Sequence, residues 1–115
     1  MPDTICIGVP YFLGERIVGR SAVDEIRASG LAAAIGAPWI DMAPDFAAHP
    51  DPIVAVNCAL AETIATHRDR APLIFVEDCV SALGAMKGLA ERDPVVLWLD
   101  AHGDFNTPAT TPSGF

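Results

Sequence analysis

The sequence predicts an α/β fold built on a mostly parallel β-sheet, and two features of its pattern indicate this. Short apolar runs alternate with longer segments in which apolar residues recur at helical spacing. The runs are almost continuously apolar, which is typical of strands covered by helices on both faces. The chain has 115 residues, enough for one domain of ordinary size. We therefore expect residues 1–115 to form a single domain.

The N-terminal elements follow from local signals. Residues 4–9 are nearly all apolar and predict a strand buried on both faces. Residues 11–20 contain two glycines and mixed charges, which favours a loop. Ser21 is expected to cap a short helix that continues through Ala28, and Gly30 to stop it.

The middle of the chain predicts a short strand followed by a longer helix. The strand lies around residues 39–41, and a loop rich in proline and aspartate covers residues 43–52. Asp51 is a good helix cap, and Pro52 suits the first helical position. The apolar side chains expected on one face of this helix are Ile53, Val56, Leu60 and Ile64.

Two further apolar runs predict the last strands. Residues 73–76 form one, which is expected to be buried, and Asp78 is expected to cap a helix that ends near Arg92. The side chains expected to face inward from this helix are Val80, Leu83 and Leu89. Residues 95–99 form the other predicted strand, with Trp98 in the core beside Trp39.

Composition narrows the class of protein. The chain is 51% hydrophobic and 19% charged, which excludes a disordered chain. The formal charge is −8, and the seven Lys and Arg residues make no basic patch, so no nucleic-acid partner is expected. This acidity fits either a protein that handles cations or one that is simply soluble.

Location follows from what the sequence lacks. No apolar run reaches the roughly 18 residues of a membrane span, so no membrane partner is expected. The N-terminus shows no signal peptide. Cys6, Cys58 and Cys79 are an odd number at unrelated spacings, so a cytoplasmic protein without a disulfide framework is expected.

A cluster of polar residues follows the last predicted strand. Asp100, His102 and Asp104 alternate with small residues, so an extended backbone would point the three side chains the same way. Carboxylate and imidazole ligands suit a divalent ion such as Mn²⁺. Because ligands bind outside the carboxyl ends of parallel strands, we expect Cys79 nearby. In the alternative, Asp100 caps a helix and His102 lies in a polar loop.

A family resemblance becomes specific at this cluster. The stretch Trp98-Leu99-Asp100-Ala101-His102-Gly103-Asp104-Phe105-Asn106-Thr107-Pro108 resembles the metal-binding signature of the arginase, agmatinase and formiminoglutamase family. Residues 109–114 match as well, and residues 7–10 and 26–31 resemble the family's start. The resemblance is sharp only over residues 97–114. It implies a three-layer α/β/α fold with a mostly parallel sheet, of which this chain is the N-terminal half.

The resemblance also implies a function. The family hydrolyses linear C–N bonds in small guanidino and amidino compounds, with a hydroxide that bridges two Mn²⁺ ions as the nucleophile. Asp100 would bridge both ions, His102 would bind one of them, and the catalytic Asp104 would bind the other. Family members often form homo-oligomers, so a homo-oligomer is expected here.

The substrate end of the site is also implied by the resemblance. Asn106, Thr111 and Ser113 occupy positions where arginases contact the amino-acid end of their substrate. Phe115 falls where arginases carry an asparagine that binds the α-carboxylate. This difference argues against arginine as the substrate and fits another guanidino or amidino compound.

Two residues depart from the family's pattern. Cys79 aligns with a metal-binding histidine, and sulfur favours Zn²⁺ or another soft divalent ion over Mn²⁺. The alternative is a plain thiol at a helix N-terminus. Glu77 replaces a glycine and is expected either to supply a carboxylate or to face water.

The remaining alternatives concern the whole chain. The family's second carboxylate motif, Asp-x-Asp, has no counterpart before Phe115, so the 115-residue chain alone is expected to be inactive. The second hypothesis is therefore a truncated or non-catalytic arginase-like scaffold with an incomplete metal site. A third, a flavodoxin-like binding module, would need a glycine-rich phosphate loop after the first strand, and residues 11–14 do not supply one.

Overall fold

A computed structural model of the protein describes residues 3–102 and 106–112. Its main sheet has three parallel strands in the order β4-β1-β5. These strands are β1 (Thr4–Val9), β4 (Trp39–Asp41) and β5 (Ala71–Val76). The prediction of an α/β fold with a parallel sheet is confirmed.

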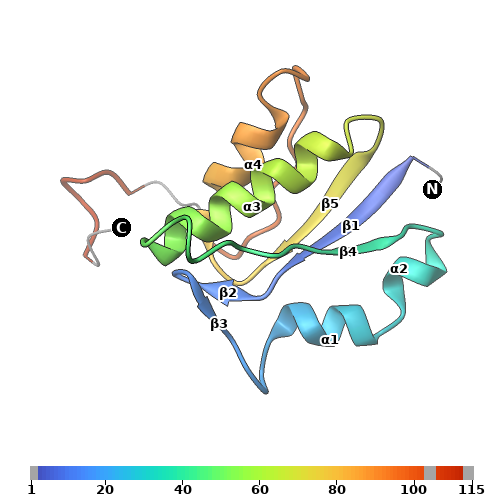
Figure 1. The fold of residues 1–115 in the computed structure, drawn as a ribbon, viewed down its shortest axis with the longest axis horizontal. Helices are drawn as coiled ribbons and strands as arrows, with labels where there is room; N and C mark the ends of the chain where they lie inside the picture. The colour runs from blue at the N-terminus through green and yellow to red at the C-terminus, as the bar shows by residue number, and fades with distance from the viewer. Residues whose placement is uncertain (1–2, 103–105, 113–115) are drawn as a thin grey trace.

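Helices cover both sides of this sheet. Figure 1 shows α3 and α4 on one side and α1 on the other, which makes three layers. The helices are α1 (Ala22–Ala28), α2 (Leu31–Ala34), α3 (Pro52–Thr66), the 3₁₀ turn η1 (Cys79–Ser81) and α4 (Ala82–Leu89). The three-layer α/β/α arrangement expected from the resemblance is therefore present.

The core lies between β1 and α3. All six residues of β1 are buried, as predicted for a central strand. The buried side chains that form this core cluster are Ile5, Ile7, Val9, Val56, Leu60 and Ile64. Cys6 in the same strand is fully buried, and burial raises the pKa of its thiol. It packs as a small hydrophobic residue, as expected.

The other face of β1 lets α1 approach closely. A Cβ on Gly8 would lie 2.5 Å from a ring carbon of Trp39 and 2.8 Å from Cγ1 of Val23 in α1. Only glycine leaves room for this contact. Trp39 stacks on Phe75, with ring centroids 5.7 Å apart. The ring that stacks on Trp39 is therefore Phe75, and not Trp98 as predicted, which is 48% exposed.

The helix caps predicted at Ser21 and Asp51 are confirmed. Ser21 Oγ accepts a hydrogen bond from the backbone N–H of Asp24 at the start of α1. Asp51 Oδ1 accepts from the N–H of Ile53 at 2.9 Å, and Pro52 occupies the first turn of α3. Each cap satisfies amide donors that have no acceptor within the helix.

Glycines bring α3 and α4 together. A Cβ on Gly84 would lie 2.5 Å from the backbone oxygen of Asn57, and the N–H of Gly84 donates to Oδ1 of Asn57 at 2.6 Å. At the far end, the Arg92 guanidinium donates to the carbonyl oxygens of Arg70 (2.8 Å), Ile64 (2.5 Å) and His67 (3.2 Å). Arg92 thus satisfies carbonyl groups at the C-terminal end of α3 and the following turn.

The predicted strand over residues 95–99 is wrong. The segment has no strand structure, and Val95 and Leu99 are 100% and 86% exposed. Trp98, expected in the core, is 48% exposed. A strand forms only where a neighbour accepts and donates its backbone hydrogen bonds, and the described sheet ends at β5. The apolar run therefore has the composition of a strand without a partner.

Three smaller predictions also need correction. Residues 11–20 are not simply a loop, because β2 (Tyr11–Phe12) and β3 (Glu15–Arg16) form a hairpin. Leu83 is 68% exposed on α4 and does not face inward. Leu73 and Val76 are each 38% exposed, because β5 lies at the edge of the described sheet.

Within the described ranges, no helix has the length and apolar character that a membrane span needs.

Candidate functional site

Cys79 and Asp100 meet beyond the carboxyl end of β5. The strand ends at Val76, and Cys79 begins η1 three residues later. The Cys79 thiol donates to Oδ2 of Asp100 with Sγ and oxygen 3.9 Å apart. The predicted proximity of these two residues is therefore observed, although residues 95–99 form no strand. The chain reaches this point at Asp100 without strand structure.

Asp100 also contacts His102. Its Oδ1 accepts a hydrogen bond from the backbone N–H of His102 at 2.9 Å, and Nδ1 of the imidazole lies 3.4 Å from the same oxygen. The imidazole itself is largely exposed to solvent. One carboxylate thus has a thiol beside one oxygen and an imidazole beside the other.

Of the predicted substrate-binding residues, the structure describes Asn106 and Thr111, which lie at a turn after His102. Asn106 and Thr111 flank a turn in which the N–H of Thr111 donates to the carbonyl of Thr107 at 3.0 Å. Oδ1 of Asn106 accepts from the Thr110 hydroxyl at 3.4 Å. Asp104 and Ser113, which were predicted as metal and substrate ligands, and Phe115 lie outside the described residues.

The donor atoms suit a divalent ion, but a complete metal site is not assembled. Cys79, Asp100 and His102 offer sulfur, oxygen and nitrogen, which are ligands for borderline transition ions such as Zn²⁺. Across residues 3–102 and 106–112, no group of three or more His, Cys, Asp or Glu side chains is arranged to hold a metal ion. The metal site therefore stays a prediction that depends in part on Asp104.

Asp78 connects the Cys79 segment to the hairpin. As predicted, it caps the element that follows, with Oδ1 accepting from the N–H of Ser81 at 3.1 Å and from its hydroxyl at 2.9 Å. Its other oxygen accepts from the N–H of Leu13 at 2.6 Å. Sequence reasoning could predict the local cap but not this second bond, because its partner is 65 residues away.

Glu77 connects the same segment to α1. Its Oε1 accepts from the Ser21 hydroxyl at 2.6 Å and from the N–H of Val23 at 3.1 Å. The sequence left two roles open for Glu77, a carboxylate for the site or a side chain in water. In the structure it is an acceptor at a helix N-terminus, where the helix dipole favours a negative charge.

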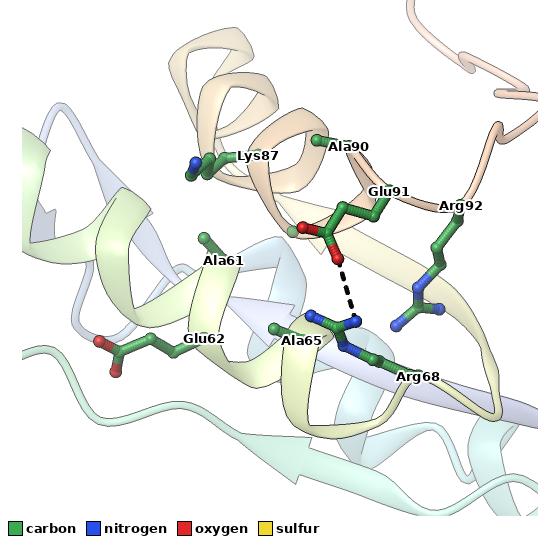
Figure 2. A pocket seen from close by; sticks show the side chains of 9 residues that line it. Ala61, Glu62, Ala65, Arg68, Lys87, Ala90, Glu91 and Arg92 are labelled. Atoms are coloured by element: carbon green, nitrogen blue, oxygen red, sulfur yellow. Dashed lines mark hydrogen bonds and ion pairs between the residues drawn. The ribbon is translucent and has the colours of Figure 1, made fainter.

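A separate hollow of about 430 Å³ lies between α3 and α4. Figure 2 shows the side chains around it, including the ion pair between Arg68 and Glu91 with nitrogen and oxygen 3.1 Å apart. This pair is exposed, so it contributes little to stability. The hollow lies near the C-terminal end of α3, which precedes the start of β5. Cys79 and Asp100 lie beyond the opposite, carboxyl end of β5. It is not part of the candidate site.

The chain is similar to several arginases. It superimposes on the crystal structure of arginase from Bacillus subtilis with a TM-score of 0.72 and 30% identity, over 96% of this chain and 42% of that one. It is 41% identical over 68 residues to arginase from Brevibacillus brevis. It is 38% identical over 65 residues to N(omega)-hydroxy-L-arginine amidinohydrolase from Streptomyces lavendulae.

These matches cover more of this chain than of its relatives. The two sequence matches include 56% and 55% of this chain but 23% of each relative. The model of the arginase family matches residues 21–115, which is most of the sequence and includes Cys79, Asp100 and His102. This chain therefore belongs to the arginase family.

Proposed function

We propose that the protein functions as a metal-dependent hydrolase of linear C–N bonds in guanidino or amidino compounds. The observation that carries this proposal is the contact of the Asp100 carboxylate with both the Cys79 thiol and the His102 imidazole. These residues lie within the part of the chain that matches the arginase family. The two named relatives, an arginase and an N(omega)-hydroxy-L-arginine amidinohydrolase, support a guanidino substrate class.

The proposed ligands of the ion are Cys79, Asp100, His102 and Asp104. Two Mn²⁺ ions are proposed from the family, and Zn²⁺ or another soft divalent ion is the alternative because Cys79 contributes sulfur. When bound, such an ion lowers the pKa of water and polarises the bond under attack. We assign the catalytic role to Asp104, together with its role as a ligand.

The chain's own residues would prepare the site in two ways. The backbone N–H of His102 fixes one oxygen of Asp100, so the carboxylate has a defined orientation before a ligand binds. The formal charge of −8 favours the approach of a cationic guanidinium group. Asn106, Thr111 and Ser113 are proposed to bind the non-reacting end of the substrate.

We propose further that the enzyme is cytoplasmic and acts as a homo-oligomer. The odd number of cysteines, at unrelated spacings, supports a reducing compartment. The chain covers 42% of the length of the matched B. subtilis arginase. Activity is therefore expected of a full-length protein, as proposed from the sequence.

Removing the central imidazole tests the function. His102→Ala in the full-length protein is expected to lower the bound metal per chain and to abolish urea release, because the ion loses a nitrogen ligand. Elemental analysis measures the metal. A urea assay over arginine, agmatine and guanidinobutyrate measures activity, together with a formamide assay over formiminoglutamate. The matched control is His49→Ala, which removes a histidine from the loop before α3, outside the candidate site.

The outcomes separate the two functional hypotheses. Unchanged metal content in His102→Ala would contradict the assignment of the site. A wild-type protein without metal, which gains metal in a Cys79→His variant, would favour the non-catalytic scaffold. Metal binding without hydrolysis of any of the four substrates would leave the substrate class without support.

A further inference from the structure

Two adjacent carboxylates precede Cys79, and both bond to the segment that links β1 to α1. Asp78 accepts from the N–H of Leu13, in the tip of the β2–β3 hairpin. Glu77 accepts from Ser21 and Val23, at the start of α1. Each carboxylate thus accepts a hydrogen bond from a residue more than 50 positions away in the sequence. Together they hold the hairpin tip and the start of α1 beside the end of β5.

The hairpin tip is itself fixed in place. Leu13 and Gly14 have φ of 46° and 83°, as a two-residue hairpin turn requires. A Cβ on Gly14 would lie 2.6 Å from the backbone carbon of Pro52 and 2.7 Å from the nitrogen of Ile53. The tip is therefore pressed against the start of α3. Asp78 therefore bonds to a turn that is packed against α3.

The position of Cys79 follows from these bonds. Its two preceding residues are tied to α1 and to the hairpin, and Ser81, two residues later, donates both its N–H and its hydroxyl to Asp78. The backbone is thus held on both sides of Cys79. This is the geometry that places the Cys79 thiol 3.9 Å from Oδ2 of Asp100.

We propose that Glu77 and Asp78 are positioning residues that fix Cys79 beside Asp100 by tying the end of β5 to the β1–α1 segment. Their value for catalysis rests on the proposed function, since Cys79 and Asp100 are the proposed metal ligands. The positioning itself is a property of the protein without metal.

Alkylation of Cys79 tests the positioning directly. The full-length protein is treated with iodoacetamide in the presence of EDTA, and peptide mass spectrometry follows each cysteine. Glu77→Ala removes both bonds to Oε1 and is expected to raise the rate at Cys79 by at least about fivefold, the effect of losing one net hydrogen bond. The thiol is then released from its contact with Asp100. Glu77→Gln is expected to match the wild type, because one oxygen, Oε1, accepts both bonds and glutamine retains it.

Asp78→Asn is expected to differ from Glu77→Gln, although both substitutions replace a carboxylate with an amide. Asp78 uses both of its oxygens, one for Ser81 and one for Leu13. An amide supplies one acceptor oxygen, so one of these bonds is lost whichever way the amide is oriented. The expected result is a rise at Cys79 similar to that of Glu77→Ala. Replacing the carboxylate with an amide would thus leave the alkylation rate of Cys79 unchanged at Glu77 and raise it at Asp78.

Cys6 is the internal control for unfolding. It is fully buried in β1, so its alkylation requires opening of the core. A faster reaction at Cys79 with an unchanged rate at Cys6, together with rescue by Glu77→Gln, would support the proposal. An unchanged rate at Cys79 in both Glu77→Ala and Asp78→Asn would overturn it. A parallel rise at Cys79 and Cys6 would also overturn it, since the carboxylates would then act on the whole fold.

Failure of the proposed function would look different. It would appear as a wild-type protein that binds no metal and releases no urea. The alkylation rates, measured in EDTA, would be unaffected by that result.

Discussion

Two apolar segments of this chain have similar composition but differ in structure and burial. Residues 4–9 form the fully buried central strand β1, whereas residues 95–99 have no strand structure and are largely exposed. The difference lies in their neighbours. β1 has a parallel strand on each edge and α3 on one face, while the described sheet offers residues 95–99 no place. An apolar run therefore predicts a strand only where partners exist.

The candidate site spans both regions. Cys79 belongs to the packed part and is held by Asp78 and Glu77, whereas Asp100 and His102 belong to the exposed segment. The packed half of the site is fixed by long-range hydrogen bonds. The exposed half is oriented mainly by the short bond from the His102 N–H to Asp100.

The same substitution in the two regions should have very different effects. Leu60→Ala removes a fully buried side chain from the core and is expected to lower the free energy of unfolding by about 2–5 kcal/mol. Leu97→Ala, at a residue that is largely exposed, is expected to change it by less than about 0.5 kcal/mol. Urea denaturation of the 115-residue chain measures both. Equal losses would mean that residues 95–99 are packed in solution.

Contact between α3 and α4 should be the next most sensitive feature. Gly84→Ala places a methyl group where Asn57 already lies, so a loss of about 1–3 kcal/mol is expected from the displaced helices. Lys87→Ala, on an exposed position of the same helix, is the matched control and should be nearly neutral. A neutral Gly84→Ala, in thermal unfolding, would show that the two helices separate easily.

Loss of the α1 cap should have the smallest of these effects. Ser21→Ala removes the oxygen that accepts from the Asp24 N–H and also a donor to Glu77, and should cost about 1 kcal/mol. Ser29→Ala, at the exposed end of the same helix, is the comparison. Chemical denaturation again gives the values. If Ser29→Ala were the more costly of the two, the start of α1 would not be the sensitive end.

Local signals in the sequence predicted the packed region well. Asp51 with Pro52 and Ser21 marked helix starts because capping depends on residues within one turn. The buried face of α3 followed from the spacing of Val56, Leu60 and Ile64. These features depend on near neighbours, so the sequence alone carries them.

Features that depend on distant partners were not predictable in the same way. The exposure of residues 95–99 reflects the extent of the sheet, and the partners of Glu77 and Asp78 are more than 50 residues away. The meeting of Cys79 and Asp100 was predicted because the carboxyl ends of parallel strands share one edge. That prediction holds although the strand on which it was built is absent, since Asp100 reaches the same edge without strand structure before it.

Arg92 determines where the chain leaves the packed body. Its guanidinium is attached to three carbonyl groups, so the backbone departs from a defined point. Asp100 follows eight residues later, and an extended chain of that length reaches at most about 29 Å. Inserting or deleting a residue in this tether would shift Asp100 relative to the thiol it now meets. The length of the connection is thus constrained as well as its composition.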